Sequence, residues 1–190
     1  MSIQARRERE RAERERLIVM AARELVEAEG WDAVTTRRLA ERVEYSQPVL
    51  YSHFKGKDAI MAAVAVEGSA DLAAELRAAG REAAPGQETL AEVSAAYLAF
   101  GERCPELYDV MFNRVLPLPW ATPETPSALQ ECFAELCRAV RPMAGPGEEA
   151  VLAEVLWSCL HGLLTLTRNG RLPRQDHDRR LALLLSRLAG

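Results

Sequence analysis

The chain has 190 residues, enough for one or two small domains with a hydrophobic core, and its 48% of apolar residues excludes a disordered polypeptide. The net charge of −4 excludes a uniformly basic nucleic-acid binder, but the charge is unevenly placed. Residues 1–57 contain 12 Lys and Arg against 10 Asp and Glu, whereas residues 58–190 contain 12 against 18. A weakly basic N-terminal part on an acidic remainder is typical of a protein that contacts DNA at one end only.

Residues 1–16 alternate arginine with glutamate, and this pattern has two interpretations. The favoured one is a solvated helical extension or a frayed tail, because neighbouring charges of opposite sign blunt one another. The alternative is an N-terminal arm whose arginines contact DNA phosphates or a minor groove. These arginines are Arg6, Arg7, Arg9 and Arg11. From Leu17 the apolar residues follow helical spacing, and Gly30 is expected to end the first helix.

Residues 36–43 predict a short second helix. Leu39 and Val43 are spaced to lie on one helical face, so that face is expected to be buried. The hydroxyl of Thr35 or Thr36 can accept a hydrogen bond from a free backbone N–H in the first turn. Either threonine is therefore a candidate N-cap.

Residues 47–54 predict a third helix after a tight turn. Ser46 is a natural N-cap, and Pro48 is tolerated because its missing N–H has no partner in the first turn. Leu50 and Phe54 are four residues apart and share a face, which leaves a polar face on the other side. Two short helices joined by a turn, the second with a polar outer face, predict a helix-turn-helix.

This stretch resembles the DNA-binding head of the TetR family of bacterial transcription regulators, over roughly residues 16–64. The residues that carry the resemblance are Thr35-Thr36-x-x-Leu39-Ala40 and Leu50-Tyr51-x-His53-Phe54-Lys55-x-Lys57. Two positions depart from the family pattern. Glu44 occupies the turn position where a glycine usually supplies a positive φ, and Pro48 stands where many members have Gly or Ala.

The resemblance implies that the third helix enters the major groove of an operator. Gln47, Val49 and Ser52 are expected to contact base edges, because glutamine can pair with adenine and valine can contact a thymine methyl. The remaining polar residues are expected mainly to bind phosphates and to set the register. The full set of expected DNA-binding residues is Thr35, Thr36, Arg37, Ser46, Gln47, Pro48, Val49, Tyr51, Ser52, His53 and Lys57.

The rest of the chain also has helical patterns. Further helices are expected at about 57–79, 88–102, 105–113, 127–140, 148–168 and 176–188, with a proline-rich loop at 116–126. The predicted fold is all-α with about nine helices. It comprises an N-terminal three-helix helix-turn-helix domain (1–56) and a C-terminal helical ligand-binding and dimerisation domain (57–190).

The last two predicted helices are apolar on more than one face, so each must be covered on more than one side. We expect a second subunit to supply that cover, as in the family, and the alternative is the core of a monomer. The candidate interface residues are Leu152, Leu156, Leu160, Leu163, Leu164, Leu181, Leu184, Leu185 and Leu188. The pattern Trp157-x-x-x-His161-Gly162 also resembles a TetR subgroup named for its Trp, His and Gly.

Aromatic and flexible apolar side chains concentrate in the middle and late helices, and ligand pockets are mostly apolar with a few polar groups. Thr165 could add a polar group. Residue by residue core packing is the favoured role, for His161 as for the others, and the prediction is only that some members of the set line a cavity. The candidate effector-binding residues are Tyr97, Phe100, Tyr108, Met111, Phe112, Trp120, Phe133, Trp157 and His161.

Other functional classes receive little support from the sequence. The four cysteines form no C-x-x-C pair, so we expect reduced, buried thiols and neither a metal nor another cofactor. The nucleotide-binding and hydrolase motifs G-x-S-x-G, Walker loop and H-E-x-x-H are missing, so no enzyme is predicted. No signal peptide or sufficiently long apolar run is evident, which predicts a cytoplasmic protein without membrane contact.

The function predicted is that of a ligand-responsive transcriptional regulator. In this hypothesis a homodimeric repressor binds a palindromic operator through two heads placed about 34–36 Å apart, and a small apolar effector releases it. The alternative is a helical small-molecule-binding or interaction protein without specific DNA binding.

Overall fold

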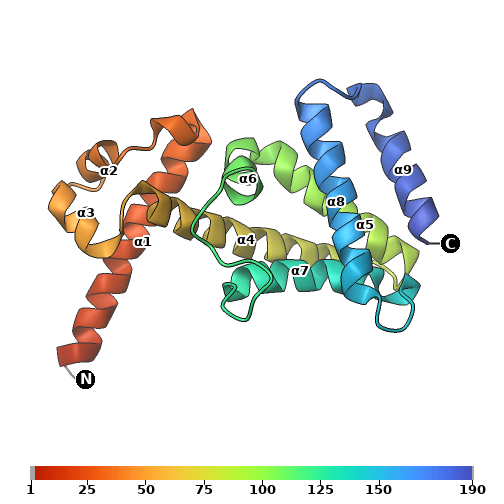
Figure 1. The fold of residues 1–190 in the computed structure, drawn as a ribbon, viewed down its shortest axis with the longest axis horizontal. Coiled ribbons are helices and arrows are strands. Elements are labelled where there is room, and N and C mark those ends of the chain that lie inside the picture. The colour runs from red at the N-terminus through yellow and green to blue at the C-terminus, as the bar shows by residue number, and fades with distance from the viewer. Residues whose placement is uncertain (1–2, 190) are drawn as a thin grey trace. The chain divides into compact units, whose positions relative to one another are not determined.

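The computed structural model describes residues 3–189, which form nine α-helices, three short 3₁₀ turns and no strand (Figure 1). The helices are α1 (Ile3–Glu29), α2 (Thr36–Arg42), α3 (Gln47–His53), α4 (Lys57–Glu82), α5 (Gln87–Arg103), α6 (Pro105–Phe112), α7 (Ser127–Val140), α8 (Glu149–Arg168) and α9 (His177–Leu188). The predicted all-α class is confirmed, and the predicted helix ends from α2 onward lie within about three residues of these bounds.

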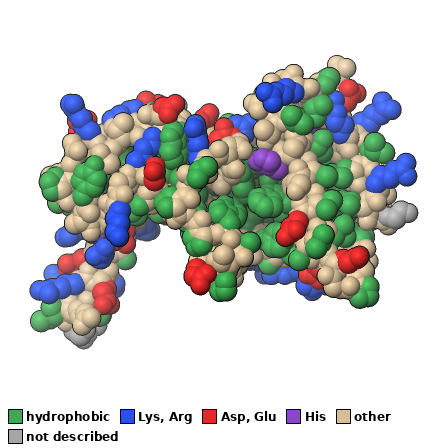
Figure 2. Space-filling model, in the orientation of Figure 1, with side chains coloured by type: hydrophobic (Ala, Val, Ile, Leu, Met, Phe, Trp, Pro, Cys, Tyr) green, Lys and Arg blue, Asp and Glu red, His purple; other side chains and the backbone are tan. Residues whose placement is uncertain are grey.

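Helix α1 begins well before its apolar stripe and includes the alternating arginines and glutamates. Ion pairs one helical turn apart line this segment, with N–O distances of 2.8 Å for both Arg6–Glu10 and Arg11–Glu15. Figure 2 shows the resulting mixture of blue and red side chains at the N-terminal end of α1. The described part of the segment is therefore a helical extension, which agrees with the favoured interpretation.

The chain divides into two compact units. One, the head unit, comprises residues up to Gly68 together with Cys104–Pro126, and the other, the body unit, comprises Ser69–Arg103 and the residues after Pro126. Helix α6 thus belongs with the N-terminal helices, because α1 packs against it. The predicted division after residue 56, into a DNA-binding domain and a ligand-binding and dimerisation domain, remains a prediction.

The core of the head unit is built on one face of α1. Ile18, Ala22, Leu25 and Val26 recur at helical spacing and are almost wholly buried. Leu39 of α2 and Leu50 of α3 are also buried, and both helices pack against α1. This packing places the helix-turn-helix on a rigid support.

The body unit is centred on three helices, α5, α7 and α8, which pack against one another. Leu156, Leu160 and Leu164 form a buried row on α8. Helix α9 packs on α5 and α8 and buries Leu185. Of the four cysteines only Cys132 is buried, and burial raises the pKa of its thiol to about 12. The expectation that all four are buried was wrong, because the other three lie at partly exposed positions.

Helix α8 is long and apolar enough to cross a membrane when judged by length and composition, which the sequence analysis did not anticipate. One such helix is weak grounds for a membrane span, since core helices of soluble proteins also meet those criteria. Only 28% of its apolar window is buried in the single chain. The helix therefore retains an apolar surface that its own protomer does not cover.

The turn between α2 and α3 contains a strained residue, which leads to a prediction about stability. Glu44 has a φ of 57°, the left-handed conformation that costs a residue with a Cβ about 1–2 kcal/mol. Replacing Glu44 with glycine should therefore stabilise the protein by about 1 kcal/mol and raise its thermal midpoint by a few degrees. Circular dichroism melting can measure this change.

The matched control is Glu44→Ala, which removes the carboxylate but retains the Cβ and the strain. We expect no gain from it. An alanine variant as stable as the glycine variant would attribute the gain to the lost charge and contradict the backbone explanation.

Candidate nucleic-acid interface

The two helices of the helix-turn-helix differ in how they begin. The Thr35 hydroxyl accepts a hydrogen bond from the backbone N–H of Arg38 at 3.2 Å, which confirms Thr35 as the N-cap of α2. Ser46 takes the N-cap position of α3, although its side chain makes no capping bond. Between them the backbone N–H of Tyr45 donates to the Ala40 carbonyl at 2.9 Å and closes the turn.

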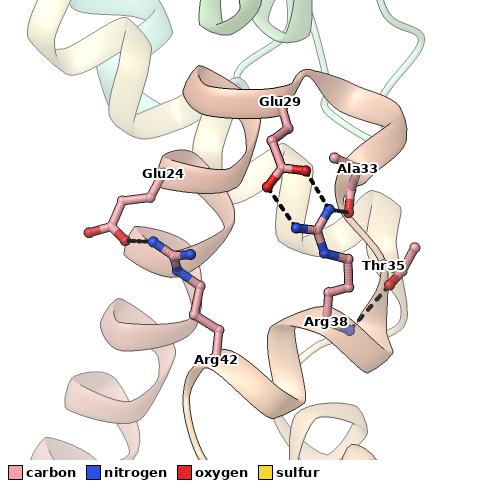
Figure 3. Close-up of polar contacts among 6 residues, drawn as sticks. All are labelled: Glu24, Glu29, Ala33, Thr35, Arg38 and Arg42. Atoms are coloured by element: carbon pink, nitrogen blue, oxygen red, sulfur yellow. Dashed lines mark hydrogen bonds and ion pairs between the residues drawn. The ribbon is translucent and has the colours of Figure 1, made fainter.

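Two arginines of α2 point back toward α1 (Figure 3). Arg38 forms a paired contact with Glu29, with N–O distances of 2.6 and 2.9 Å, and also donates to the Ala33 carbonyl. Arg42 binds Glu24 at 2.7 Å. Both guanidinium groups are therefore committed to holding α2 against α1. The sequence offered no signal for these contacts, since the partners lie 9 and 18 residues away.

The Arg38–Glu29 pair predicts a pH-dependent stability. The hydrogen bond from Arg38 lowers the pKa of Glu29 below its ordinary value. A carboxylate with a lower pKa in the folded state stabilises the fold above the unfolded glutamate pKa of about 4.3, and this contribution is lost as the pH falls through the folded value. We expect Glu29→Gln to melt at a lower temperature than the natural protein at pH 7, with the difference shrinking as the pH falls below about 4.3.

Thermal melts across this pH range provide the measurement. The control is Glu8→Gln, at an exposed position on α1, and it should leave the melting curve unchanged at both ends of the range. A deficit for Glu29→Gln that persists undiminished at pH 3 would contradict the proposed role of the charge.

Helix α3 has one buried and one exposed side. Leu50 faces the core and is 1% exposed, whereas Gln47, Tyr51 and Ser52 lie exposed, and we call these three the outer face of α3. Ser46 and Pro48, at the start of the helix, are also exposed, and Val49 is half-buried. The outer face is polar and carries no charged side chain, which suits hydrogen bonding to base edges.

Tyr51 extends from the outer face toward the start of α2, where its hydroxyl lies 3.5 Å from that of Thr36. Thr35 and Arg37 are exposed beside it, and Arg37 forms an ion pair with Glu41 at 2.9 Å. These hydroxyl and guanidinium groups lie at the N-terminal end of α2. A helix N-terminus with free N–H groups is a suitable place for a phosphate.

Two of the predicted phosphate-binding residues point elsewhere. The His53 side chain is only 7% exposed, and its Nδ1 lies 3.3 Å from the carboxylate of Glu15 on α1. The Lys57 ammonium donates to the Trp31 carbonyl at 2.7 Å and lies 4.4 Å from the centre of the Trp31 ring. The His53 side chain therefore packs within the head unit. The Lys57 ammonium uses one of its N–H groups in a hydrogen bond within the same unit.

The Trp31 ring has a second cation against it, which the sequence analysis missed. The Arg114 guanidinium carbon lies 5.2 Å from the ring centre, close enough for a cation–π interaction. Burial lowers the pKa of Lys57, and the nearby carboxylates of Asp32 and Asp58 oppose this shift. Trp31 thus joins α4 and the segment after α6 within the head unit.

The predicted effector-binding residues fall into two groups. Tyr108, Met111, Phe112 and Trp120 belong to the head unit, and the other five belong to the body unit. In the body unit the Trp157 indole N–H donates to the Tyr97 hydroxyl at 2.9 Å, which links α8 to α5. The structure thus brings Trp157 and Tyr97 into contact, but it divides the full set of predicted effector-binding residues between the two units.

The predicted interface leucines are also divided by burial. Leu156, Leu160, Leu164 and Leu185 lie in the core of the protomer itself, whereas Leu152, Leu163, Leu181, Leu184 and Leu188 are partly exposed. Four apolar residues outside the candidate interface set are more exposed than these. They are Val151, Val155 and Leu166 on α8 and Leu183 on α9.

These observations define an all-helical protein of the helix-turn-helix class. Residues 18–64 match the family model of bacterial regulatory proteins of the tetR family, and residues 90–188 match that of the tetracyclin repressor-like C-terminal domain. The chain belongs to the TetR family of DNA-binding transcriptional regulators, which are not enzymes. Membership in the Trp-His-Gly subgroup stays a prediction.

Similar proteins support the same assignment. The chain is 28% identical over 173 residues to an HTH-type transcriptional regulator of Mycobacterium tuberculosis, which covers 90% of this chain and 78% of that one. It is 48% identical over 48 residues to the class C tetracycline repressor of Escherichia coli, a match to 25% of this chain and 22% of the repressor. A solved structure of a protein of unknown function from Rhodococcus sp. RHA1 superposes with a TM-score of 0.75 at 25% identity, covering 92% of both chains, and shares the fold.

Proposed function

We propose that this protein regulates transcription by inserting α3 into the major groove of a specific operator. The observation that carries the proposal is the polar, uncharged outer face of α3, held by the buried Leu50 on a head that α1 supports. In the DNA complex Gln47 and Ser52 contact base edges, and the half-buried Val49 contacts a thymine methyl.

Phosphate contacts would set the register of the head on DNA. Thr35, Thr36, Arg37 and Tyr51 surround the N-terminal end of α2 and would bind one strand there. Lys57 retains N–H groups beyond the one bound to Trp31 and would add a contact at the start of α4. His53 is left out of the proposed contacts because its side chain is buried against α1.

A homodimer would present two heads to a palindromic operator. The support is a row of apolar and small residues on α8 that its own protomer leaves exposed or only partly covered, which we call the outer row: Val151, Val155, Ser158, Gly162 and Leu166. Gly162 has open space where a Cβ would lie, so a partner helix could approach closely. The partly exposed leucines of α8 and α9 would flank this row.

A small effector would bind in the body unit and cause the protein to release the operator. The protein would be a repressor located in the cytoplasm, and effector binding would end the repression. The buried Tyr97 and the partly exposed Trp157, which are joined by a hydrogen bond, would contribute the aromatic side chains of this effector site. Near Trp157 in sequence, the Thr165 hydroxyl is buried without a hydrogen-bond partner among the residues that the structure describes, and such groups are rare in folded proteins. A polar group of a mostly apolar ligand could satisfy it.

A gel-shift experiment tests the DNA-binding proposal. The DNA is a pool of random duplexes from which the protein selects, and the binding constant of the selected sequence is measured at several salt concentrations. We expect a palindromic consensus and an affinity that falls steeply with salt, because phosphate contacts release counterions. Failure to enrich any sequence, or an affinity independent of salt, would contradict the proposal.

A further inference from the structure

The body unit contains a cleft of about 300 Å³ that lies apart from the aromatic residues discussed above. It is formed by the last turns of α4, the first half of α5 and the second half of α7. Its floor includes Val93 and Ala139, which are buried. This volume is at the lower end of the range for small-molecule sites, so the cleft suits a compact ligand.

Four of the eight residues that line this cleft are charged. Arg77 and Arg81 project from α4 and Arg138 from α7, and Glu135 is the single carboxylate among the lining residues. The Glu135 side chain is 6% exposed and forms ion pairs with both Arg77, at 2.7 Å, and Arg138. The buried carboxylate is thus neutralised, and it holds two guanidinium groups in fixed positions.

Much of the hydrogen-bonding capacity of these arginines remains unused. Arg77 donates through Nε to Glu135 and through Nη2 to Glu131 at 3.0 Å, which leaves Nη1 available. The side chain of Arg81 has no hydrogen bond or ion pair with any residue that the structure describes. Planar guanidinium groups match the geometry of carboxylates and phosphates, which they bind through paired N–H donors.

We propose that this cleft binds a small molecule carrying more than one anionic group, either carboxylate or phosphate. Arg81 binds one anionic group directly, and the guanidinium groups held by Glu135 bind another. The anionic ligand contacts both α4 and α7, so it stabilises their packing. This site is separate from the proposed apolar effector site and does not depend on DNA binding.

Isothermal titration calorimetry on the full chain tests the proposal, with sodium citrate and sodium pyrophosphate, which each carry more than one anionic group, as probes at constant ionic strength. We expect saturable binding of at least one probe, and a thermal midpoint that rises with its concentration. Arg81→Gln should weaken that binding by about tenfold, the loss expected for a charge-assisted hydrogen bond. Because Arg81 supports no other described contact, this variant should fold and melt as the natural protein does.

The matched control is Arg171→Gln, which removes an exposed arginine from the segment between α8 and α9 of the same unit. It should bind the probe with unchanged affinity. Binding that does not saturate for either probe, or that is equally strong in the Arg81→Gln variant, would overturn the proposal. Which probe binds more tightly decides between carboxylate and phosphate as the natural group.

Discussion

Replacing Gln47 with alanine is expected to weaken binding to the selected operator by about tenfold to a hundredfold and to relax the base preference at one position in each half-site. The reason is that Gln47 lies exposed at the start of α3, where its amide can form paired hydrogen bonds with an adenine edge. Its side chain contributes nothing to the buried core, so the fold should be unaffected. Fluorescence anisotropy with the operator and its single-base variants measures both effects.

The matched control is Gln175→Ala, an exposed glutamine in the turn before α9. This variant should bind the operator as the natural protein does. A Gln47→Ala variant with unchanged affinity and unchanged base preference would remove Gln47 from the set of base-reading residues. A uniform loss across all sequences would reassign it to phosphate contact.

Replacing Val155 with arginine is expected to separate the dimer. Val155 is 46% exposed in the single chain, so the protomer can accommodate a longer side chain, whereas a symmetric interface would bury two unpaired guanidinium groups. Burying an unpaired charge costs several kcal/mol, so we expect the dimer dissociation constant to rise by about a hundredfold or more. Sedimentation equilibrium measures this constant directly.

Operator affinity should fall together with dimerisation, because a single head contacts only one half-site. The control is Val115→Arg, the same substitution at a fully exposed valine in the segment after α6. This variant should remain dimeric and bind the operator normally. A natural protein that sediments as a monomer, or a Val155→Arg variant that stays dimeric, would contradict the proposed interface on the outer row of α8.

The helix positions could be predicted because they depend on local chemistry. The spacing of apolar residues, the Thr35 cap and the proline-rich loop act over a few residues, and α7 occupies the predicted range without change. The resemblance to the TetR family rested on similarly local motifs. Even the strained position was identifiable, because Glu44 occupies a turn position that usually requires glycine, and its φ is positive.

Contacts between distant residues could not be predicted in this way. His53 lies on a short helix whose outer face is polar, but its side chain turns inward to Glu15, which is 38 residues earlier. Helical spacing places Arg38 and Arg42 on one face of α2, but it does not say that this face meets Glu29 and Glu24 of α1, while Arg37 is left exposed. These outcomes depend on the angle at which α1 crosses the helix-turn-helix, which no local pattern encodes.

By itself the sequence determined the all-α class, the order of the helices, the helix-turn-helix and the family, because helical periodicity and capping are local properties of the chain. Only the tertiary structure decided which face of each helix is covered. On α8 both Val155 and Leu156 are apolar, and packing against α5 and α7 buries Leu156 and leaves Val155 exposed. The 300 Å³ cleft of the body unit likewise depends on tertiary structure, because α4 and α7 bring Arg81 and Arg138, which are 57 residues apart in the chain, to one wall. Burial and charge neutralisation are set by neighbours in space, so they follow from the packing of the whole chain.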